Sequence, residues 1–346
     1  MLKNSKPSLE RLNLLGPLIL LGALGISLLV VEGLAQLYYR GVIRKNFQQP
    51  GMYRYDPRKG WVLNDGVFRQ KHYDFEALYT ISDGRRRTVS SAGVEHETLN
   101  IYGDSFAFGI GVPDEETIAS HLSQLGLSSV QNLGVSGYGP DQYFLAYQDA
   151  VSRQAAAWHL FLIYTGNDYK DLIAATDEGK QRYKPVLQPK GPGYVWLYPP
   201  GYEVHSSSRA FAFYSFQFLK YLAKSSALLI RLYNSLASPD RDLVHEALQR
   251  FDYLYSSLPR DKCFFAIVPS LSLVRGISLK ASEGFWEQSL HDYLTAEGFV
   301  FVNIYRRHIL GAGDFWPHEG HPTAEGNRKI AQALLEGIEP LRRKVL

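Results

Sequence analysis

The pattern of hydrophobic and polar positions begins with a long apolar stretch near the N-terminus. Near the N-terminus, the 20 residues between Arg11 and Glu32 carry no charged side chain and are rich in leucine. At a rise of about 1.5 Å per residue, a helix over 12–31 is about 30 Å long, which is enough to cross a bilayer. A buried core helix of a soluble domain normally keeps a polar face. The pattern therefore predicts a transmembrane helix over 12–31.

The residues that follow this span favour an uncleaved signal anchor over a cleaved signal peptide. A cleaved signal peptide usually has a shorter apolar core and then a small-x-small cleavage site, whereas Val-Val-Glu-Gly-Leu at 30–34 follows directly here. Since the flank before the span is short, we expect residues 1–11 to stay in the cytoplasm and the rest of the chain to lie outside it. The flanking basic residues are nearly balanced in number: Lys3, Lys6 and Arg11 before the span, and Arg40, Arg44 and Lys45 after it.

Residues 32–97 show no long periodic pattern and are rich in tyrosine and in turn-forming pairs, such as Asp-Gly at 83–84. This composition predicts a lead-in or linker of short strands and turns. Three consecutive arginines at 85–87 are compatible with an anionic ligand. Three adjacent charges in a turn are more typical of a solvated surface, so we assign no site to them.

From about residue 98, short apolar runs alternate with helical periodicity, which is typical of a parallel sheet covered by helices. We therefore predict that residues 98–346 form one α/β domain, a three-layer αβα sandwich around a central, mostly parallel five-stranded sheet. The apolar runs that predict the strands are 99–102, 130–133, 160–164, 264–268 and 300–304.

An aromatic-rich insertion at about 170–239 interrupts this alternation and is too long for an ordinary loop. Its rings could stack on sugars or form a lid, but a phenylalanine-rich run is more typical of packing. The aromatic residues concerned include Trp196, Phe211, Phe213, Phe216 and Phe218.

Composition narrows the classes of function. Hydrophobic residues make up 45% of the chain and charged residues 21%, as in ordinary globular domains, which excludes a disordered or multi-span protein. The 37 Lys and Arg residues against 34 Asp and Glu residues leave a net charge of +3, too small to indicate a nucleic-acid partner. With a single cysteine, Cys263, the chain can form neither an intrachain disulfide nor a cysteine zinc cluster.

Candidate catalytic residues lie in the loops that follow the predicted strands. In doubly wound sheets the ligand lies beyond the carboxyl ends of the strands, and Ser105, Gly137, Asn167 and His321 follow four elements of this sheet. Acyl transfer needs a nucleophile, a base and hydrogen-bond donors for the developing oxyanion. We therefore expect Ser105 to be the nucleophile and His321 the base. The N–H groups of Ser105 and Gly137 and the carboxamide of Asn167 are the expected oxyanion hole.

These residues and the Gly-Asp-Ser triplet at 103–105 give the chain a resemblance to the SGNH (GDSL-type) hydrolase superfamily. The four motifs occur in the family's order, the resemblance covers roughly residues 98–341, and the layout is similar to that of membrane-anchored bacterial members. The resemblance implies a flavodoxin-like αβα fold, an acyl-serine intermediate and no cofactor. It further implies that Ser105, Gly137, Asn167 and His321 are the four name-giving residues.

One position departs from the family pattern. The family commonly has an acid three residues before the base, and here that position is His318. Glu319 and Asp314 are the candidates for orienting His321, and a backbone carbonyl or no orienting group at all are the alternatives. The third member of such a triad fixes the tautomer and orientation of the imidazole, so its absence would weaken catalysis.

Each residue taken alone has a simpler explanation as a turn, helix-cap or surface residue; taken together, the four favour a site. A metal site at His318 and His321 is disfavoured, because the two are not spaced i, i+4 as in the zinc-protease helix. An α/β-hydrolase is also disfavoured, because Ala107 occupies the second glycine position of the Gly-x-Ser-x-Gly elbow.

The expected function is therefore that of a serine esterase acting on acyl, most simply acetyl, esters of a carbohydrate or cell-envelope substrate. A lipid ester is the next substrate class. The alternatives are a polysaccharide O-acetyltransferase that uses the same site, and a non-catalytic glycan-binding or assembly protein with the same fold. The resemblance and the anchor together imply a single-pass protein of a bacterial inner membrane, with its catalytic domain in the periplasm or otherwise outside the cytoplasm.

Overall fold

The computed structural model describes residues 15–43, 47–90, 98–127, 129–153, 158–177, 182–202, 238–276 and 281–345. The predicted cytoplasmic flank, the first residues of the predicted span and the phenylalanine-rich run of the insertion lie outside these residues. The chain divides into two compact units, which are described separately: Met1–Lys45 with Ser207–Ser226, and Asn46–Ser206 with Ala227–Leu346.

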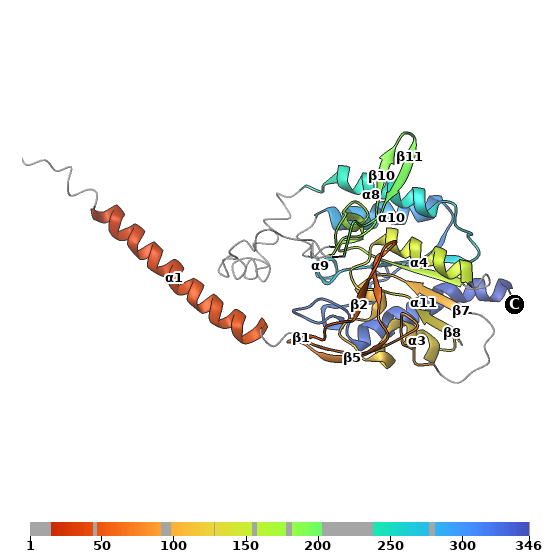
Figure 1. The fold of residues 1–346 in the computed structure, drawn as a ribbon, viewed down its shortest axis with the longest axis horizontal. Helices are drawn as coiled ribbons and strands as arrows, with labels where there is room; N and C mark the ends of the chain where they lie inside the picture. Colours follow the sequence, from red (N-terminus) through yellow and green to blue (C-terminus); the bar gives the residue numbers. More distant parts are fainter. Residues whose placement is uncertain are drawn as a thin grey trace, which may run out of the picture. The chain divides into compact units, whose positions relative to one another are not determined.

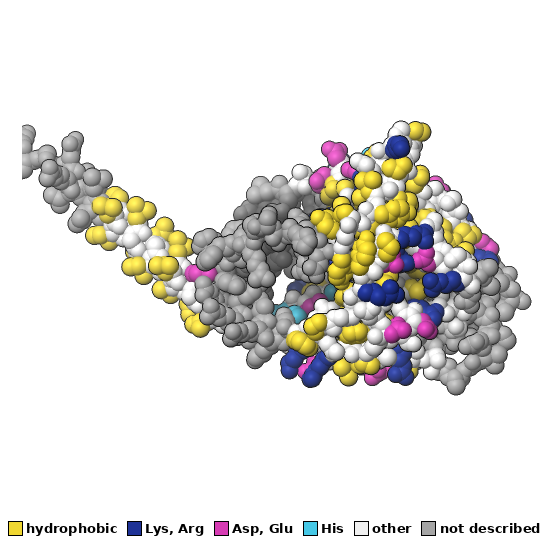
Figure 2. Space-filling model, in the orientation of Figure 1, with side chains coloured by type: hydrophobic (Ala, Val, Ile, Leu, Met, Phe, Trp, Pro, Cys, Tyr) yellow, Lys and Arg dark blue, Asp and Glu magenta, His cyan; other side chains and the backbone are white. Residues whose placement is uncertain are grey.

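In the first unit, helix α1 (Leu15–Ile43) contains residues 15–31 of the predicted apolar span (Figure 1). Its segment Gly16–Leu34 has a mean hydropathy of 2.1, and no residue in it is buried. Figure 2 shows hydrophobic side chains around this helix. Of the described helices, α1 alone is long and apolar enough to cross a membrane, a criterion that a signal sequence also meets. The helix continues beyond the predicted end at residue 31, because the following residues include good helix formers such as Leu34 and Leu37.

The second unit is built on a mixed sheet whose strand order is β1-β4-β5-β6-β8-β7-β9-β12-β13. Its last five strands are parallel to one another and coincide with the five predicted strands. The first of them in sequence, β7, lies between the second and the third, which is the topological switch point of a doubly wound sheet. These strands are β7 (Thr98–Tyr102), β8 (Ser129–Asn132), β9 (Trp158–Tyr164), β12 (Cys263–Val268) and β13 (Val300–Asn303).

Helices cover both faces of the parallel strands and form a core on each face. Helices α3 (Ile118–Gln124) and α11 (Ala324–Val345) bury Leu122 and Leu334 against one face. The opposite core contains Tyr143, Phe251 and Trp286 from three helices. Those helices are α4 (Pro140–Arg153), α8 (Arg241–Tyr255) and α10 (Ala281–Ala296). The predicted three-layer αβα sandwich is therefore confirmed.

Residues 47–86 belong to the same compact unit as the parallel strands. Four short strands of this segment extend the sheet in antiparallel pairing, and β6 joins it by pairing Arg86 with Asn132 of β8. The compact unit accordingly begins at Asn46 and not at residue 98. The physical reason is that β8 would otherwise present an unpaired edge. The added strands are β1 (Phe47–Gln48), β4 (Gly66–Lys71), β5 (Glu76–Ser82) and β6 (Arg85–Arg86), and β2 (Tyr53–Asp56) and β3 (Gly60–Leu63) form a separate hairpin.

Contrary to the prediction of a solvated surface, the arginine triplet is not solvated throughout, because Arg86 is only 1% exposed. Its Nε donates to Asp114 Oδ1 at 2.8 Å, and its Nη2 donates to the carbonyl of Val112 at 3.0 Å. The guanidinium also lies over the rings of Tyr79 and Phe108, at 4.3 and 4.8 Å. Arg86 is thus a structural residue that fastens the antiparallel extension to the parallel strands.

A second buried ion pair fixes the described part of the insertion to the sheet layers. Lys184 and Asp141 are both completely buried, and Lys184 Nζ lies 2.7 and 2.6 Å from the two Asp141 carboxylate oxygens. The same ammonium donates to the carbonyl of Asp171 at 2.6 Å. The insertion continues into a hairpin of β10 (Val186–Lys190) and β11 (Gly193–Leu197). Lys184 thus connects the start of α4 to the segment that leads into this hairpin.

We predict that Lys184→Met lowers the free energy of unfolding by about 3 to 5 kcal/mol, because it leaves the Asp141 charge buried without its partner. The double variant Lys184→Met/Asp141→Leu should lose less, since it buries no unpaired charge. Urea unfolding of the full chain in non-ionic detergent measures both values. The exposed Lys190 on the same hairpin provides the control Lys190→Met, and a Lys184→Met loss no larger than that of this control contradicts the prediction.

Candidate active site

Ser105 lies just beyond the carboxyl end of β7, at the start of the short helix α2 (Ser105–Phe108). The preceding Asp104 caps this helix, because its carboxylate accepts the N–H of Phe106 at 2.8 Å. Gly109 ends the helix in the left-handed conformation (φ 84°), which glycine adopts without strain. This sharp turn directs the Ser105 hydroxyl away from the sheet and leaves it half-buried.

His321 reaches Ser105 from a loop far along the sequence. Its Nε2 lies 2.6 Å from Ser105 Oγ, within hydrogen-bond distance. The loop closes on itself, since the N–H of Trp316 donates to the carbonyl of His321 and the N–H of Gly320 donates to the carbonyl of Trp316, both at 2.8 Å. Gly320 has φ 89°, a conformation that favours glycine. The loop geometry therefore presents the imidazole to the hydroxyl.

Glu319 is the acidic residue that contacts His321. Glu319 Oε2 forms a short hydrogen bond with His321 Nδ1 and accepts the N–H of His321 at 3.1 Å. Burial alone would lower the pKa of His321, but the charge and the hydrogen bond of Glu319 outweigh burial and raise it. Burial would likewise raise the pKa of Glu319, and the charge and hydrogen bonds of His321 lower it instead. Charge on both partners is thus favoured.

Asp314, the other candidate for this position, is engaged elsewhere. Both of its carboxylate oxygens lie 2.9 Å from Lys329 Nζ, and one of them accepts the N–H of Gly311 at 2.7 Å. Asp314 thereby joins the loop to helix α11. Of the alternatives left open by the sequence, the structure brings Glu319 to the imidazole.

His318, at the family's usual acid position, turns away to Asp74. His318 Nδ1 lies 2.6 Å from Asp74 Oδ1, and Asp74 Oδ2 accepts the N–H groups of His318 and Glu319 at 2.9 and 3.0 Å. Burial would raise the pKa of Asp74, but the hydrogen bonds and charge of His318 lower it. Asp74 belongs to the turn between β4 and β5, so the antiparallel extension holds the loop that carries Glu319. No local signal in the sequence indicated this residue.

The two other predicted site residues follow the strands that flank β7. Gly137 follows β8 and has φ 82°, and Asn167 follows β9 and precedes α5 (Asp168–Asp171). Asn167 Nδ2 donates one hydrogen to Asp171 Oδ2 at 2.6 Å, which leaves the second amide hydrogen for another acceptor. Because β8 and β9 are the neighbours of β7, the loops after them border Ser105 on either side.

Arg182 is a residue beside this site that the sequence did not single out. A Cβ on Gly137 would lie 2.9 Å from Arg182 Nη2, so the guanidinium packs directly against that glycine. The guanidinium lies 4.1 Å from the ring centre of Trp61, and its Nε donates to Asp177 Oδ2 at 3.0 Å. Its Nη1 is buried and has no hydrogen-bond partner among the described residues. A fixed positive charge therefore borders the candidate oxyanion hole.

Within the described ranges, no group of three or more His, Cys, Asp or Glu side chains is arranged to hold a metal ion. The groups that meet at this site are the Ser105 hydroxyl, the His321 imidazole and the Glu319 carboxylate.

In comparisons with known proteins, the chain is similar to several solved structures. A scan of protein-family models and a search of curated proteins find no match. A lipolytic G-D-S-L family member from Veillonella parvula DSM 2008 is similar to 70% of this chain, over 97% of its own length, at 12% identity and TM-score 0.39. The acetylxylan esterase Axe2 from Geobacillus stearothermophilus is similar to 70% of this chain, over 94% of its own length, at 12% identity and TM-score 0.35.

We predict that His321 in the folded protein titrates above the ordinary value of about 6.5 and that Glu319→Gln lowers its pKa. The substitution removes the negative charge that favours the imidazolium and leaves the burial that opposes it. NMR titration of the His321 ring in the full chain measures both values. Asp314→Asn is the matched control, because Asp314 is engaged with Lys329, and it should leave the His321 pKa unchanged. An unchanged pKa in Glu319→Gln contradicts the assignment of Glu319.

Proposed function

We propose that the protein is a serine hydrolase that cleaves acyl esters, most simply acetyl esters, through an acyl-serine intermediate. The observation that carries this proposal is the continuous contact from Ser105 Oγ to His321 Nε2, and from His321 Nδ1 to Glu319. A nucleophile, a base and an orienting acid in this order are the arrangement that activates a serine hydroxyl. The same three residues argue against a non-catalytic protein. Glu319 contacts the imidazole of His321 and so supplies the acid that is missing at position 318.

In the first step, His321 Nε2 takes the Ser105 proton while Ser105 Oγ attacks the ester carbonyl. The charge on Glu319 stabilises the imidazolium that forms. The N–H groups of Ser105 and Gly137 and the remaining N–H of Asn167 are the donors for the oxyanion, and each such donor typically contributes about 3 to 4 kcal/mol to the transition state. The imidazolium then protonates the departing alcohol.

In the second step, His321 takes a proton from water as the water attacks the acyl-serine. The tetrahedral intermediate collapses and releases the acid, and Ser105 regains its proton from His321. A sugar hydroxyl that replaced this water would turn hydrolysis into O-acetyl transfer by the same site. Product analysis with and without a hydroxyl acceptor separates the two reactions.

For the substrate, we propose an acylated carbohydrate or cell-envelope polymer, with a lipid ester as the second class. The support is the apolar helix α1, which is long enough to anchor the enzyme beside the cell envelope. We further propose that α1 is an uncleaved signal anchor with residues 1–11 in the cytoplasm. The catalytic unit would then lie in the periplasm of a bacterium.

We predict that the full chain in non-ionic detergent hydrolyses a short-chain aryl acetate and that Ser105→Ala lowers kcat by at least about 10⁴-fold. The variant loses the only nucleophile of the proposed mechanism while its circular dichroism spectrum and unfolding midpoint stay the same. An organophosphonate probe should add its mass at Ser105 in the wild-type chain and at no residue of the variant. Hydrolysis that persists undiminished in Ser105→Ala would falsify the proposal.

We also predict that kcat/KM for this ester rises with pH through the pKa of His321. The base must be neutral to accept the Ser105 proton, and its raised pKa means that activity is lost as the pH falls through a value above about 6.5. Glu319→Gln should shift this acidic limb to lower pH and reduce kcat by up to about 10⁴-fold. A pH–rate series on both proteins makes the measurement, and an acidic limb that is identical in the two excludes Glu319 as the partner of the base.

A further inference from the structure

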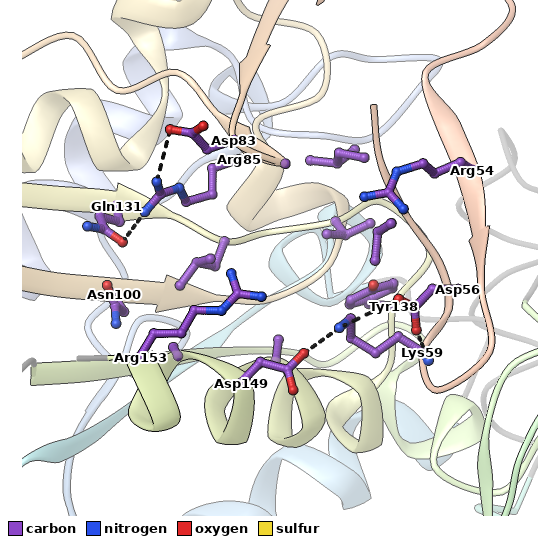
Figure 3. A pocket seen from close by; sticks show the side chains of 17 residues that line it. Arg54, Asp56, Lys59, Asp83, Arg85, Asn100, Gln131, Tyr138, Asp149 and Arg153 are labelled. Carbon is purple, nitrogen blue, oxygen red and sulfur yellow. Dashed lines mark hydrogen bonds and ion pairs between the residues drawn. The ribbon is translucent and has the colours of Figure 1, made fainter. Parts of the chain in front are cut away.

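A cavity of about 500 Å³ lies on the α4 side of the parallel strands, outside the candidate active site. Its walls come from the β2–β3 hairpin, the β5–β6 turn, strands β7 and β8, and helix α4 (Figure 3). Neither Ser105 nor His321 lines it. Tyr138, the neighbour of Gly137, does line it, so the cavity extends up to the loop that follows β8.

The carboxylates around this cavity are already paired. Asp149 forms ion pairs with Arg58 and Lys59, which lie in the β2–β3 turn. Asp56 Oδ1 accepts the N–H groups of Arg58 and Lys59 at 2.9 and 2.7 Å. Asp83 Oδ2 lies 3.4 Å from Nη2 of Arg85. The charges of Asp149 and Asp83 are therefore compensated by cations of the same rim, and that of Asp56 by backbone N–H groups and by Lys59 Nζ at 3.9 Å.

Two arginines of the cavity have no such partner within the described part of the chain. Arg54 extends from β2 and Arg153 from the last turn of α4, and in Figure 3 the two guanidinium groups reach into the cavity from different sides. Arg85 adds a third guanidinium, whose Nη1 is held by Gln131 Oε1 at 2.7 Å. Guanidinium groups bind carboxylate and phosphate oxygens by paired N–H donors. The cavity thus has a surplus of donors that suit an oxyanion.

Asn100 contributes a complementary acceptor from strand β7. Its side chain is 1% exposed and lines the cavity, and its Oδ1 has no hydrogen-bond partner among the described residues. This unpaired oxygen lies behind the β7 wall of the cavity and makes that wall polar.

We propose that this cavity binds an acidic sugar chain, with carboxylate or phosphate groups held by Arg54 and Arg153. The preference for an anion follows from the charges of the cavity alone. The choice of a sugar rests on the proposed function, since an enzyme that deacylates a glycan has to hold the glycan beside the reacting ester. The cavity is then a subsite that selects acidic over neutral glycans.

Calorimetric titration of the full-length Ser105→Ala chain in non-ionic detergent tests this proposal without turnover. The probes are a glucuronic acid tetrasaccharide, a neutral glucose tetrasaccharide and inorganic phosphate. We expect the acidic tetrasaccharide to bind more tightly than both others and more weakly as salt is added. Arg54→Gln and Arg153→Gln should each raise its Kd by about 10-fold, because each removes a charge-assisted contact. Both side chains are exposed, so neither change should impair folding.

Arg87→Gln is the matched control, because Arg87 is an exposed arginine outside the cavity, and its Kd should equal that of the parent. Equal affinity for the acidic and neutral tetrasaccharides overturns the proposal, as does an unchanged Kd in the Arg54→Gln/Arg153→Gln double variant. Phosphate that binds more tightly than the acidic sugar overturns the assignment of a sugar. Selective binding by a chain whose Ser105 form hydrolyses no ester would sink the proposed function and leave this site standing.

Discussion

The proposed activity depends on one contact between distant loops, the hydrogen bond of 2.6 Å between His321 Nε2 and Ser105 Oγ. These residues are 216 positions apart in the sequence, and the parallel sheet brings them together. Strand β7 delivers Ser105 at the switch point, and the loop before α11 delivers His321 to the same edge. Because both loops are closed by their own backbone hydrogen bonds, the contact is set by the fold before any substrate binds.

The antiparallel extension holds the loop at this edge of the sheet in place. Its Asp74 accepts two N–H groups from the loop that carries Glu319, and its Arg86 is buried against Asp114. Successive side chains of a strand point to opposite faces, which explains why Arg85 lines a cavity while Arg86 is part of the core. Residues that a linear sequence presents as one basic cluster therefore serve two different purposes.

The sequence was sufficient for the parallel strands, because apolar runs are local features, and it singled out Ser105 and His321, which lie in contact in the structure. It could not choose between Glu319 and Asp314, since both precede His321 by a few residues and only the loop conformation separates them. It also could not find Asp74 or Arg182. Asp74 is 244 residues from His318, and Arg182 acts through its packing against Gly137 and Trp61, so neither leaves a pattern along the chain.

Four loops are proposed to form one acyl-transfer site, and a crystal structure of the full chain after reaction with an organophosphonate tests this proposal. Phosphorus is expected to be bonded to Ser105 Oγ. One phosphonyl oxygen should lie about 2.7 to 3.1 Å from the backbone nitrogens of Ser105 and Gly137 and from Asn167 Nδ2. A phosphonyl oxygen directed away from these donors, or an unmodified Ser105 with another residue labelled, would contradict this proposal.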